Sequence, residues 1–176
     1  VYGFLLTLFK AIKDLTANYI AACFDTEKPT FRHQKYKEYK IHRPPTPKDI
    51  ISQIYLMKEV LKSFDIPVFE KDGFEADDLI ATIAKKTKSQ AETFILSGDL
   101  DNLQLVDEKI RVYTLGKGIK DSVLYDEQKV VERFGVKPEQ MNDFKALTGD
   151  ASDNIPGVPG IGKKTAAELI KKYQNL

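Results

Sequence analysis

The stretch Gly73-Phe74-Glu75-Ala76-Asp77-Asp78 decides the fold that we predict for this chain. It follows a short apolar run at 66–69 and opens a segment at 75–88 whose apolar side chains recur at helical spacing. This order is typical of a buried strand followed by a helix that covers the sheet. The chain therefore contains at least one α/β unit, with acidic residues where the strand passes into the helix.

The same alternation extends in both directions from this unit. Apolar runs predict further strands at 18–24, 92–96 and 110–114, and helical spacing predicts helices at 1–15, 46–64 and 100–106. Thr46 is placed to cap the helix at 46–64, with Pro47 at its first helical position. Strands that alternate with helices favour an α/β domain over residues 1–125, with a mostly parallel central sheet and flanking helices.

After residue 125 only helical patterns remain. They lie at 126–133, 138–147 and 162–173 and predict a helical subdomain over residues 126–176. The chain begins inside an amphipathic pattern and ends just after a helix. We therefore expect both ends to be cuts through a larger protein, and the subdomain to be truncated.

The composition excludes several classes of protein. Of the 176 residues, 42% are hydrophobic and 30% are charged, which is ordinary for a globular protein. Cys23 is the single cysteine, so no internal disulfide can form and a reducing cytoplasm is favoured. No apolar stretch approaches the ~18 residues of a membrane span, so we expect no membrane contact. The net charge of +1 leaves nucleic-acid binding to be decided by how the charges are distributed.

Acidic residues recur at the points where predicted strands end. Because the carboxyl ends of parallel strands meet at one edge of a sheet, we expect these acids to converge there. Each group alone is explained as well by a helix dipole, a turn or a cap. Together, crowded carboxylates need a counterion, and ligands that offer only oxygen suit two Mg²⁺ or Mn²⁺ ions. The predicted metal ligands are Asp25, Glu75, Asp77, Asp78, Asp99, Asp101, Asp150 and Asp153.

The segment 26–46 is basic and aromatic, with little apolar periodicity. Lysine and arginine follow a phosphate backbone, and aromatic faces stack on bases without reading sequence. The plain alternative is a solvated basic loop. Beside a carboxylate site we favour single-strand binding, with Phe31, Tyr36, Lys37 and Tyr39 as contacts.

A glycine-rich stretch before the last predicted helix offers a second nucleic-acid contact. Glycine lets a backbone approach phosphate closely, and the helix that follows presents its first amides. An ordinary turn between two helices is the alternative. We favour a helix-hairpin-helix that holds duplex DNA, formed by Gly157, Gly160, Ile161, Gly162, Lys163, Lys164 and Thr165.

Several motifs in order resemble the 5′-nuclease domains of bacterial DNA polymerase I, within the PIN-like superfamily. They are Phe24-Asp25, Phe31-Arg32-His33, Tyr39-Lys40, Arg43, the 73–78 stretch, Ser97-Gly98-Asp99-Leu100-Asp101, Leu147–Gly157 and Gly160–Ala166. The resemblance covers essentially the whole chain. It implies that the eight carboxylates bind two divalent metals, and that 26–46 forms part of an arch past which the 5′ strand runs.

The resemblance also implies an activity and its setting. It implies hydrolysis of DNA phosphodiesters at 5′ flaps or 5′ ends, including RNA-primed ends, in replication and repair. Lys40 and Arg43 match positions that approach the scissile phosphate, with Arg32 assisting, and hairpin carbonyls of the family often hold K⁺. We expect a monomer that works in a bacterial cytoplasm, at the nucleoid.

Two departures keep alternatives open. The family begins with a strand that carries another metal-binding aspartate, which this chain does not include, and Leu100 stands where the family usually has lysine or arginine. A fragment that binds flap DNA without cutting it is therefore the main alternative. A PIN-like ribonuclease is a third hypothesis, which the hairpin after Asp153 disfavours.

Overall fold

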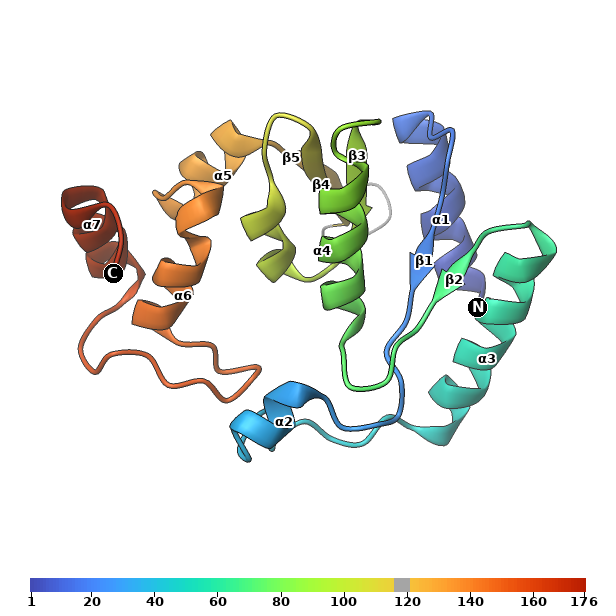
Figure 1. Ribbon diagram of the computed structural model, residues 1–176, viewed down its shortest axis with the longest axis horizontal. Coiled ribbons are helices and arrows are strands. Elements are labelled where there is room, and N and C mark those ends of the chain that lie inside the picture. Colours follow the sequence, from blue (N-terminus) through green and yellow to red (C-terminus); the bar gives the residue numbers. More distant parts are fainter. Residues whose placement is uncertain (116–120) are drawn as a thin grey trace.

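The computed structural model describes residues 1–115 and 121–176 and has the predicted mixture of strands and helices (Figure 1). Its elements in chain order are α1 (Tyr2–Leu15), β1 (Ala22–Cys23), α2 (Phe31–Lys35), α3 (Lys48–Ser63), β2 (Val68–Phe69), α4 (Ala76–Thr87), β3 (Thr93–Leu96), η1 (Leu100–Leu105), β4 (Ile110–Leu115), β5 (Ser122–Tyr125), α5 (Glu127–Phe134), η2 (Pro138–Gln140), α6 (Met141–Thr148) and α7 (Lys163–Tyr173). The two η elements are short 3₁₀ turns. Every helix that we predicted is present within a few residues of its expected bounds.

The strands form two small sheets in the described part of the chain, where we predicted one. In the first sheet β1 pairs in parallel with β2, and in the second β3 pairs in parallel with β4. Strand β5 then pairs antiparallel with β4, which we did not predict. It has four residues, of which only Tyr125 is buried, so its hydrophobic pattern is too short to stand out.

The main hydrophobic core lies between the three-stranded sheet and the helices around it. Helix α4 lies across this sheet, and α5, α6 and α7 continue to one side (Figure 1). Side chains from β4, η1, α5 and α7 are almost completely buried in it. They include Leu103, Ile110, Val112, Val130 and Ile170. This core continues from the α/β part into the helical part, which fixes the helical part against the sheet.

Local sequence explains where the helices begin and end. Glu75 is the N-cap of α4 and forms a capping box with Asp78, as the acidic first turn suggested. Asp126 caps α5 by accepting the N–H of Lys129, and Gly135 ends that helix with a positive φ. The start of α3 differs from the prediction, because Pro47 is itself the N-cap and no side chain caps the helix, Thr46 included.

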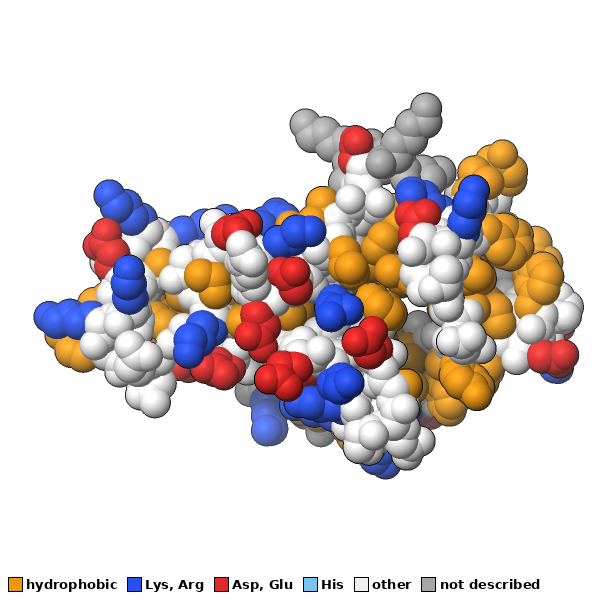
Figure 2. All heavy atoms as spheres, turned by 90° about the horizontal axis from the view of Figure 1, so that it is seen from above, with side chains coloured by type: hydrophobic (Ala, Val, Ile, Leu, Met, Phe, Trp, Pro, Cys, Tyr) orange, Lys and Arg blue, Asp and Glu red, His pale blue; other side chains and the backbone are white. Residues whose placement is uncertain are grey.

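The face shown in Figure 2 carries acidic and basic side chains that are interspersed, with hydrophobic side chains gathered at one end. That end is formed by α1 and α3, where Tyr2, Phe9 and Phe64 are exposed. None of the helices in the described chain combines the length and apolar character that a membrane span requires.

Candidate functional site

The acids after β1 and at the start of α4 meet at one edge of the molecule. Asp25 lies two residues beyond β1, and its Oδ1 accepts the N–H of Ala76 at 2.7 Å. Ala76 is the first residue of α4, directly after Glu75. A strand end and a helix start that are about 50 positions apart in sequence are thus in direct contact. The convergence that we expected from strand topology holds for these two segments.

Asp77 lies in the most crowded part of this edge. Burial is the main reason that its pKa is raised, and the negative charges of Asp99, Asp25 and Glu75 add to the effect. Asn102 opposes the shift, because its Nδ2 donates to Asp77 Oδ1 at 2.9 Å. Four carboxylates from three chain segments therefore act on one another electrostatically.

A second acidic group joins the α/β part to the helical part through Lys145. The Lys145 Nζ lies 2.5 Å from Asp101 Oδ1 and 2.5 Å from Asp150 Oδ2. Burial would raise the pKa of Asp150, but hydrogen bonds from Lys145 and Ser152 outweigh it, and the pKa is lowered. At Asp101 burial prevails over Lys145 and the pKa is raised. Asp101, Lys145 and Asp150 line a small pocket of about 280 Å³, and Asp153 also borders it.

The three basic residues expected to act on phosphate lie against the carboxylates. Arg32 forms a bidentate pair with Asp78, with both N–O distances 2.8 Å. Lys40 Nζ lies 2.8 Å from Glu75 Oε1. Arg43 reaches Asp153 Oδ1 at 3.5 Å, and its side chain is 55% exposed. The segment 26–46 thus folds toward the acidic edge, and its cations neutralise carboxylates there.

Tyr39 differs from its expected role in this segment. It is only 5% exposed, and its hydroxyl lies between Glu75 and Asp153, so its ring is not available to stack on a base. Burial, followed by those two carboxylates, raises its pKa well above the usual range. Phe31 is half-buried against Phe74, and Lys37 is exposed. Tyr36 is half-buried, with its hydroxyl 3.1 Å from the Asn154 carbonyl.

The loop that carries Asp150 and Asp153 is shaped by two glycines. A Cβ on Gly149 would lie 2.4 Å from the Gly157 nitrogen, and a Cβ on Gly157 would lie 2.4 Å from the Thr148 carbonyl carbon. Only glycine allows the two backbones to approach so closely. The loop is closed by a bridge between Asp150 and Ile155, with 2.8 Å hydrogen bonds in both directions.

This loop also forms hydrogen bonds with residues 38–40 of the segment 26–46, which we call the arch segment. The Lys40 N–H donates to the Asp153 carbonyl at 3.0 Å, and Asn154 Nδ2 donates to the Glu38 carbonyl at 2.9 Å. In Figure 1 the loop after α6 runs close to the α2 region accordingly. The first and last of the predicted site segments are therefore joined by backbone contacts as well as by charge.

The glycine-rich hairpin leads into α7 with an exposed first turn. Gly160 has φ +81°, and the Ile161 N–H closes the turn on the Val158 carbonyl at 3.0 Å. Gly162 is the N-cap of α7, and no side chain from the described chain caps this helix. Lys163, Lys164 and Thr165 are exposed in its first turn. An uncapped first turn with exposed residues suits an anion site at a helix N-terminus.

The donor set suits a hard divalent cation, but the ligands are not assembled for one. Within residues 1–115 and 121–176, no three acidic, histidine or cysteine side chains are grouped closely enough to hold an ion. Lys145 places a positive charge between Asp101 and Asp150, where a cation would balance them. The oxygen-only ligands and their crowding fit Mg²⁺ or Mn²⁺, provided that the lysines and arginines move aside.

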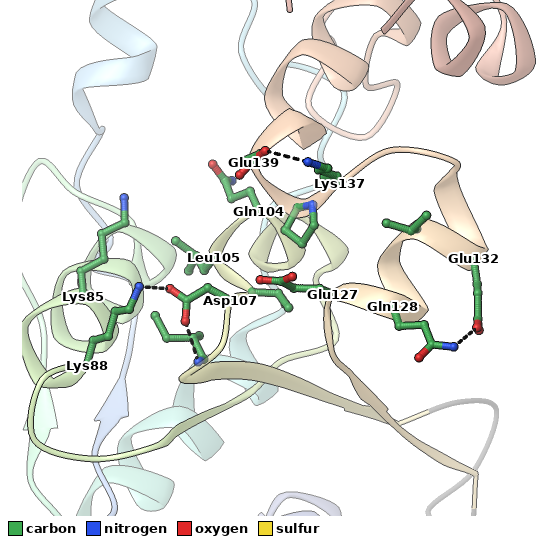
Figure 3. A pocket seen from close by; sticks show the side chains of 14 residues that line it. Lys85, Lys88, Gln104, Leu105, Asp107, Glu127, Gln128, Glu132, Lys137 and Glu139 are labelled. Atoms are coloured by element: carbon green, nitrogen blue, oxygen red, sulfur yellow. Dashed lines mark hydrogen bonds and ion pairs between the residues drawn. The ribbon is translucent and has the colours of Figure 1, made fainter. Parts of the chain in front are cut away.

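A second, separate cavity provides a contrast to this edge. It has a volume of about 870 Å³ and is bordered by the end of α4, by η1, and by α5 and η2 (Figure 3). Two ion pairs lie among its lining residues, Lys88 with Asp107 and Lys137 with Glu139.

Sequence reasoning missed three residues at the site. The side chain of Lys145 donates a hydrogen bond to Asp150, and that of Asn102 donates one to Asp77. The side chain of Asn154 donates one to the Glu38 carbonyl. Lys145 is on a predicted helix five residues before Asp150, a spacing that gives no contact within a regular helix. Asn102 and Asn154 are each next to a predicted ligand, but only the tertiary arrangement shows what their amides contact.

A carboxylate edge, a basic segment folded against it and a glycine-rich helical hairpin occur together in this fold, a combination suited to contacts with a phosphate backbone. Comparison with known proteins makes the class specific. The model of the 5′-3′ exonuclease N-terminal resolvase-like domain matches residues 1–135, and that of the 5′-3′ exonuclease C-terminal SAM fold matches residues 136–176. The chain belongs to the 5′-3′ exonuclease family.

Individual relatives agree with this assignment. The chain is 44% identical to DNA polymerase I of Mycobacterium bovis and 42% identical to that of Bacillus subtilis, covering all of this chain and 20% of each relative. It thus spans about one fifth of the length of these relatives.

Among solved structures, a T5 protein co-crystallised with metal ions has a TM-score of 0.83 at 27% identity, over 99% of this chain and 69% of the other. A T5 flap endonuclease in complex with DNA and metal ions has a TM-score of 0.80 at 25% identity, over 99% and 67%.

Proposed function

We propose that this chain is a divalent-metal-dependent, structure-specific 5′-nuclease that hydrolyses DNA phosphodiesters at 5′ flaps or 5′ ends. The observation that supports it best is the acidic edge itself. Carboxylates from four separate segments are gathered there, with Arg32, Lys40 and Arg43 among them. Such a set suits cations that bind a phosphodiester, and the basic side chains suit the charge that develops on its phosphorus.

The carboxylates hold the metals in this proposal. Asp25, Glu75, Asp77, Asp78, Asp99, Asp101, Asp150 and Asp153 are the candidate ligands for two Mg²⁺ or Mn²⁺ ions. These ions, when bound, activate water and stabilise the leaving 3′-oxygen. Asp78 already accepts Arg32 and the Glu75 N–H, so it orients Arg32 as well. Metal ions bound to the related T5 proteins support this assignment.

The basic and glycine-rich segments hold DNA in this proposal. The arch segment takes the 5′ single strand, with Phe31, Tyr36 and Lys37 in contact with it. The hairpin takes the duplex through Gly157, Gly160, Ile161 and Gly162 and the α7 residues that follow, with K⁺ on its carbonyls. We infer a monomer that acts on bacterial nucleoid DNA, including RNA-primed strands, in replication and repair.

One observation favours a second function, the binding of flap DNA without cleavage. No three of the described carboxylates are grouped as a metal site, and lysine or arginine already neutralises several of them. An edge that remained in this state would hold DNA without cutting it.

Cleavage of a 5′-flap DNA by this chain with Mg²⁺ or Mn²⁺ separates the two functions. We expect cleavage that Asp99→Asn and Asp153→Asn each reduce by at least about 100-fold, with flap binding retained. Asp49→Asn, in the exposed first turn of α3, is the matched control and should cut normally. Tight flap binding without cleavage by the unaltered chain would reject the nuclease in favour of the binding fragment.

A further inference from the structure

Tyr39 is buried in a segment that is otherwise largely exposed. Its side chain is 5% exposed, whereas Lys37, Glu38 and Ile41 around it are exposed. Its hydroxyl oxygen lies 3.0 Å from Glu75 Oε2 and 3.1 Å from Asp153 Oδ2. A single hydroxyl proton is therefore shared between two carboxylates, one from the start of α4 and one from the loop after α6.

The ring of Tyr39 is held on several sides. His33 packs edge-to-face against it, with ring centroids 5.2 Å apart at 82°. His33 is itself anchored by Thr30, whose N–H and Oγ1 lie 3.2 Å and 2.9 Å from Nδ1. Lys40 Nζ lies 4.9 Å from the ring centroid. These contacts fix the direction of the hydroxyl, so it acts as a rigid spacer between the two acids.

The Lys40 N–H holds the backbone of Asp153, but a further contact is needed to fix the separation of the Glu75 and Asp153 carboxylate groups. The two residues belong to different parts of the chain, and their negative charges repel. Lys40 contacts Glu75 closely but reaches Asp153 only at 3.9 Å. Arg43 is mostly exposed and reaches Asp153 alone. The hydroxyl of Tyr39 is the short, buried contact that reaches both carboxylates.

We propose that Tyr39 is a positioning residue that sets the separation of Glu75 and Asp153 for a divalent cation. This inference rests on the proposed nuclease function and replaces the base-stacking role expected from sequence. A positioning role requires the hydroxyl of Tyr39, and an aromatic ring alone does not suffice. A base-stacking role would require the ring and not the hydroxyl.

Tyr39→Phe separates the two roles, because it keeps the ring and removes only the hydroxyl. We expect Mn²⁺ affinity without DNA, measured from free Mn²⁺ by electron paramagnetic resonance, to fall about tenfold or more. Flap-DNA affinity in EDTA should stay within about twofold, since the buried ring and the surface charges are unchanged. Tyr113→Phe is the matched control, because that buried hydroxyl donates to Asp14, away from the site.

Each outcome bears on the inference. Weaker Mn²⁺ binding by Tyr39→Phe, with Tyr113→Phe unchanged, supports it. Equal Mn²⁺ affinity for Tyr39→Phe and the unaltered chain overturns it and leaves the proposed nuclease standing. An equal loss in both variants also overturns it, because the loss is then general. If the unaltered chain binds no Mn²⁺, the proposed metal site fails and the inference fails with it.

Discussion

At the scale of single residues, lysine and arginine side chains neutralise the negative charge of the acidic edge. Lys145 bridges Asp101 and Asp150, and Lys40 and Arg32 neutralise Glu75 and Asp78. Removing one partner from a partly buried pair leaves an uncompensated charge, which costs more than the pair contributes. These lysines and arginines therefore stabilise the edge as it stands in this structure.

Asp107 gives a pH-dependent test at this scale, away from the site. Its Oδ1 accepts the N–H groups of Lys109 and Ile110 at 2.8 and 3.0 Å, and its Oδ2 pairs with Lys88. Burial would raise its pKa, but these partners outweigh burial and lower it. The charged form thus stabilises the fold above the unfolded-state pKa of about 4, and the contribution is lost as pH falls through the lowered pKa.

We therefore expect Asp107→Asn to lower the free energy of unfolding by about 1 kcal/mol near neutral pH, and by progressively less as the pH falls through the lowered pKa of Asp107. Urea unfolding near neutral pH and at acidic pH measures this difference. The exposed Asp121→Asn is the control and should change neither value. A loss for Asp107→Asn that is the same at both pH values would contradict the linkage.

Single residues also show how far sequence reasoning reaches. The acids at strand ends and helix starts were predictable, because strand topology alone places Asp25 beside the start of α4. The roles of Tyr39 and Lys145 were not, because they depend on contacts across the tertiary structure. Tyr39 meets carboxylates 36 and 114 positions away, and no local pattern specifies such partners.

At the scale of elements, two glycines between α6 and α7 differ in how closely other atoms surround them. A Cβ on Gly157 would meet the backbone of Thr148, Gly149 and Leu147 within 2.6 Å, whereas Gly162 has nothing within 4 Å. The first glycine is required for packing, and the second leaves the α7 amides open. Substitution should separate these two roles.

Gly157→Ala should lower the free energy of unfolding by about 1–3 kcal/mol, because backbone atoms cannot move out of the way of the methyl group. Gly162→Ala should cost at most about 1 kcal/mol, yet it should weaken duplex-DNA binding by holding phosphate away from the amides. Urea unfolding and fluorescence anisotropy measure the two effects. Normal duplex affinity for Gly162→Ala would argue against the hairpin as a DNA contact.

Helices were easier to predict than strands in this chain. The helical spacing of α1, α3 and α4 extends over three or more turns, so periodicity locates them. Strands β1 and β2 have two residues each, and the Pro67 beside them has no N–H for a ladder. The predicted runs at 18–24 and 66–69 therefore exceed the hydrogen-bonded strands.

At the scale of the whole molecule, the net charge of +1 does not show that acidic and basic residues are concentrated in different places. Acids gather at one edge, and basic residues gather in the arch segment and at the two ends of α7. Nonspecific DNA affinity comes mainly from phosphate contacts, so it should depend on these local groups rather than on net charge.

Replacing Lys163 and Lys164 together by alanine should reduce the slope of log affinity against log salt by up to about 2, since each lost phosphate contact contributes about 0.9. Titration of flap DNA across a series of salt concentrations measures the slope. Lys85→Ala with Lys86→Ala, in the last turn of α4, is the matched pair and should leave the slope unchanged. Equal changes in both pairs would show that DNA is not held at α7.

The contacts between the arch segment and the loop after α6 have a kinetic consequence. They include pairs more than 100 positions apart, such as Tyr39 with Asp153 at 114 and Tyr36 with Asn154 at 118. Contacts of such high sequence separation close large loops and tend to form late in folding. During synthesis, residues 1–135 are made before Asp150 and Asp153 exist. The acidic edge can therefore be completed only after the loop after α6 has been synthesised.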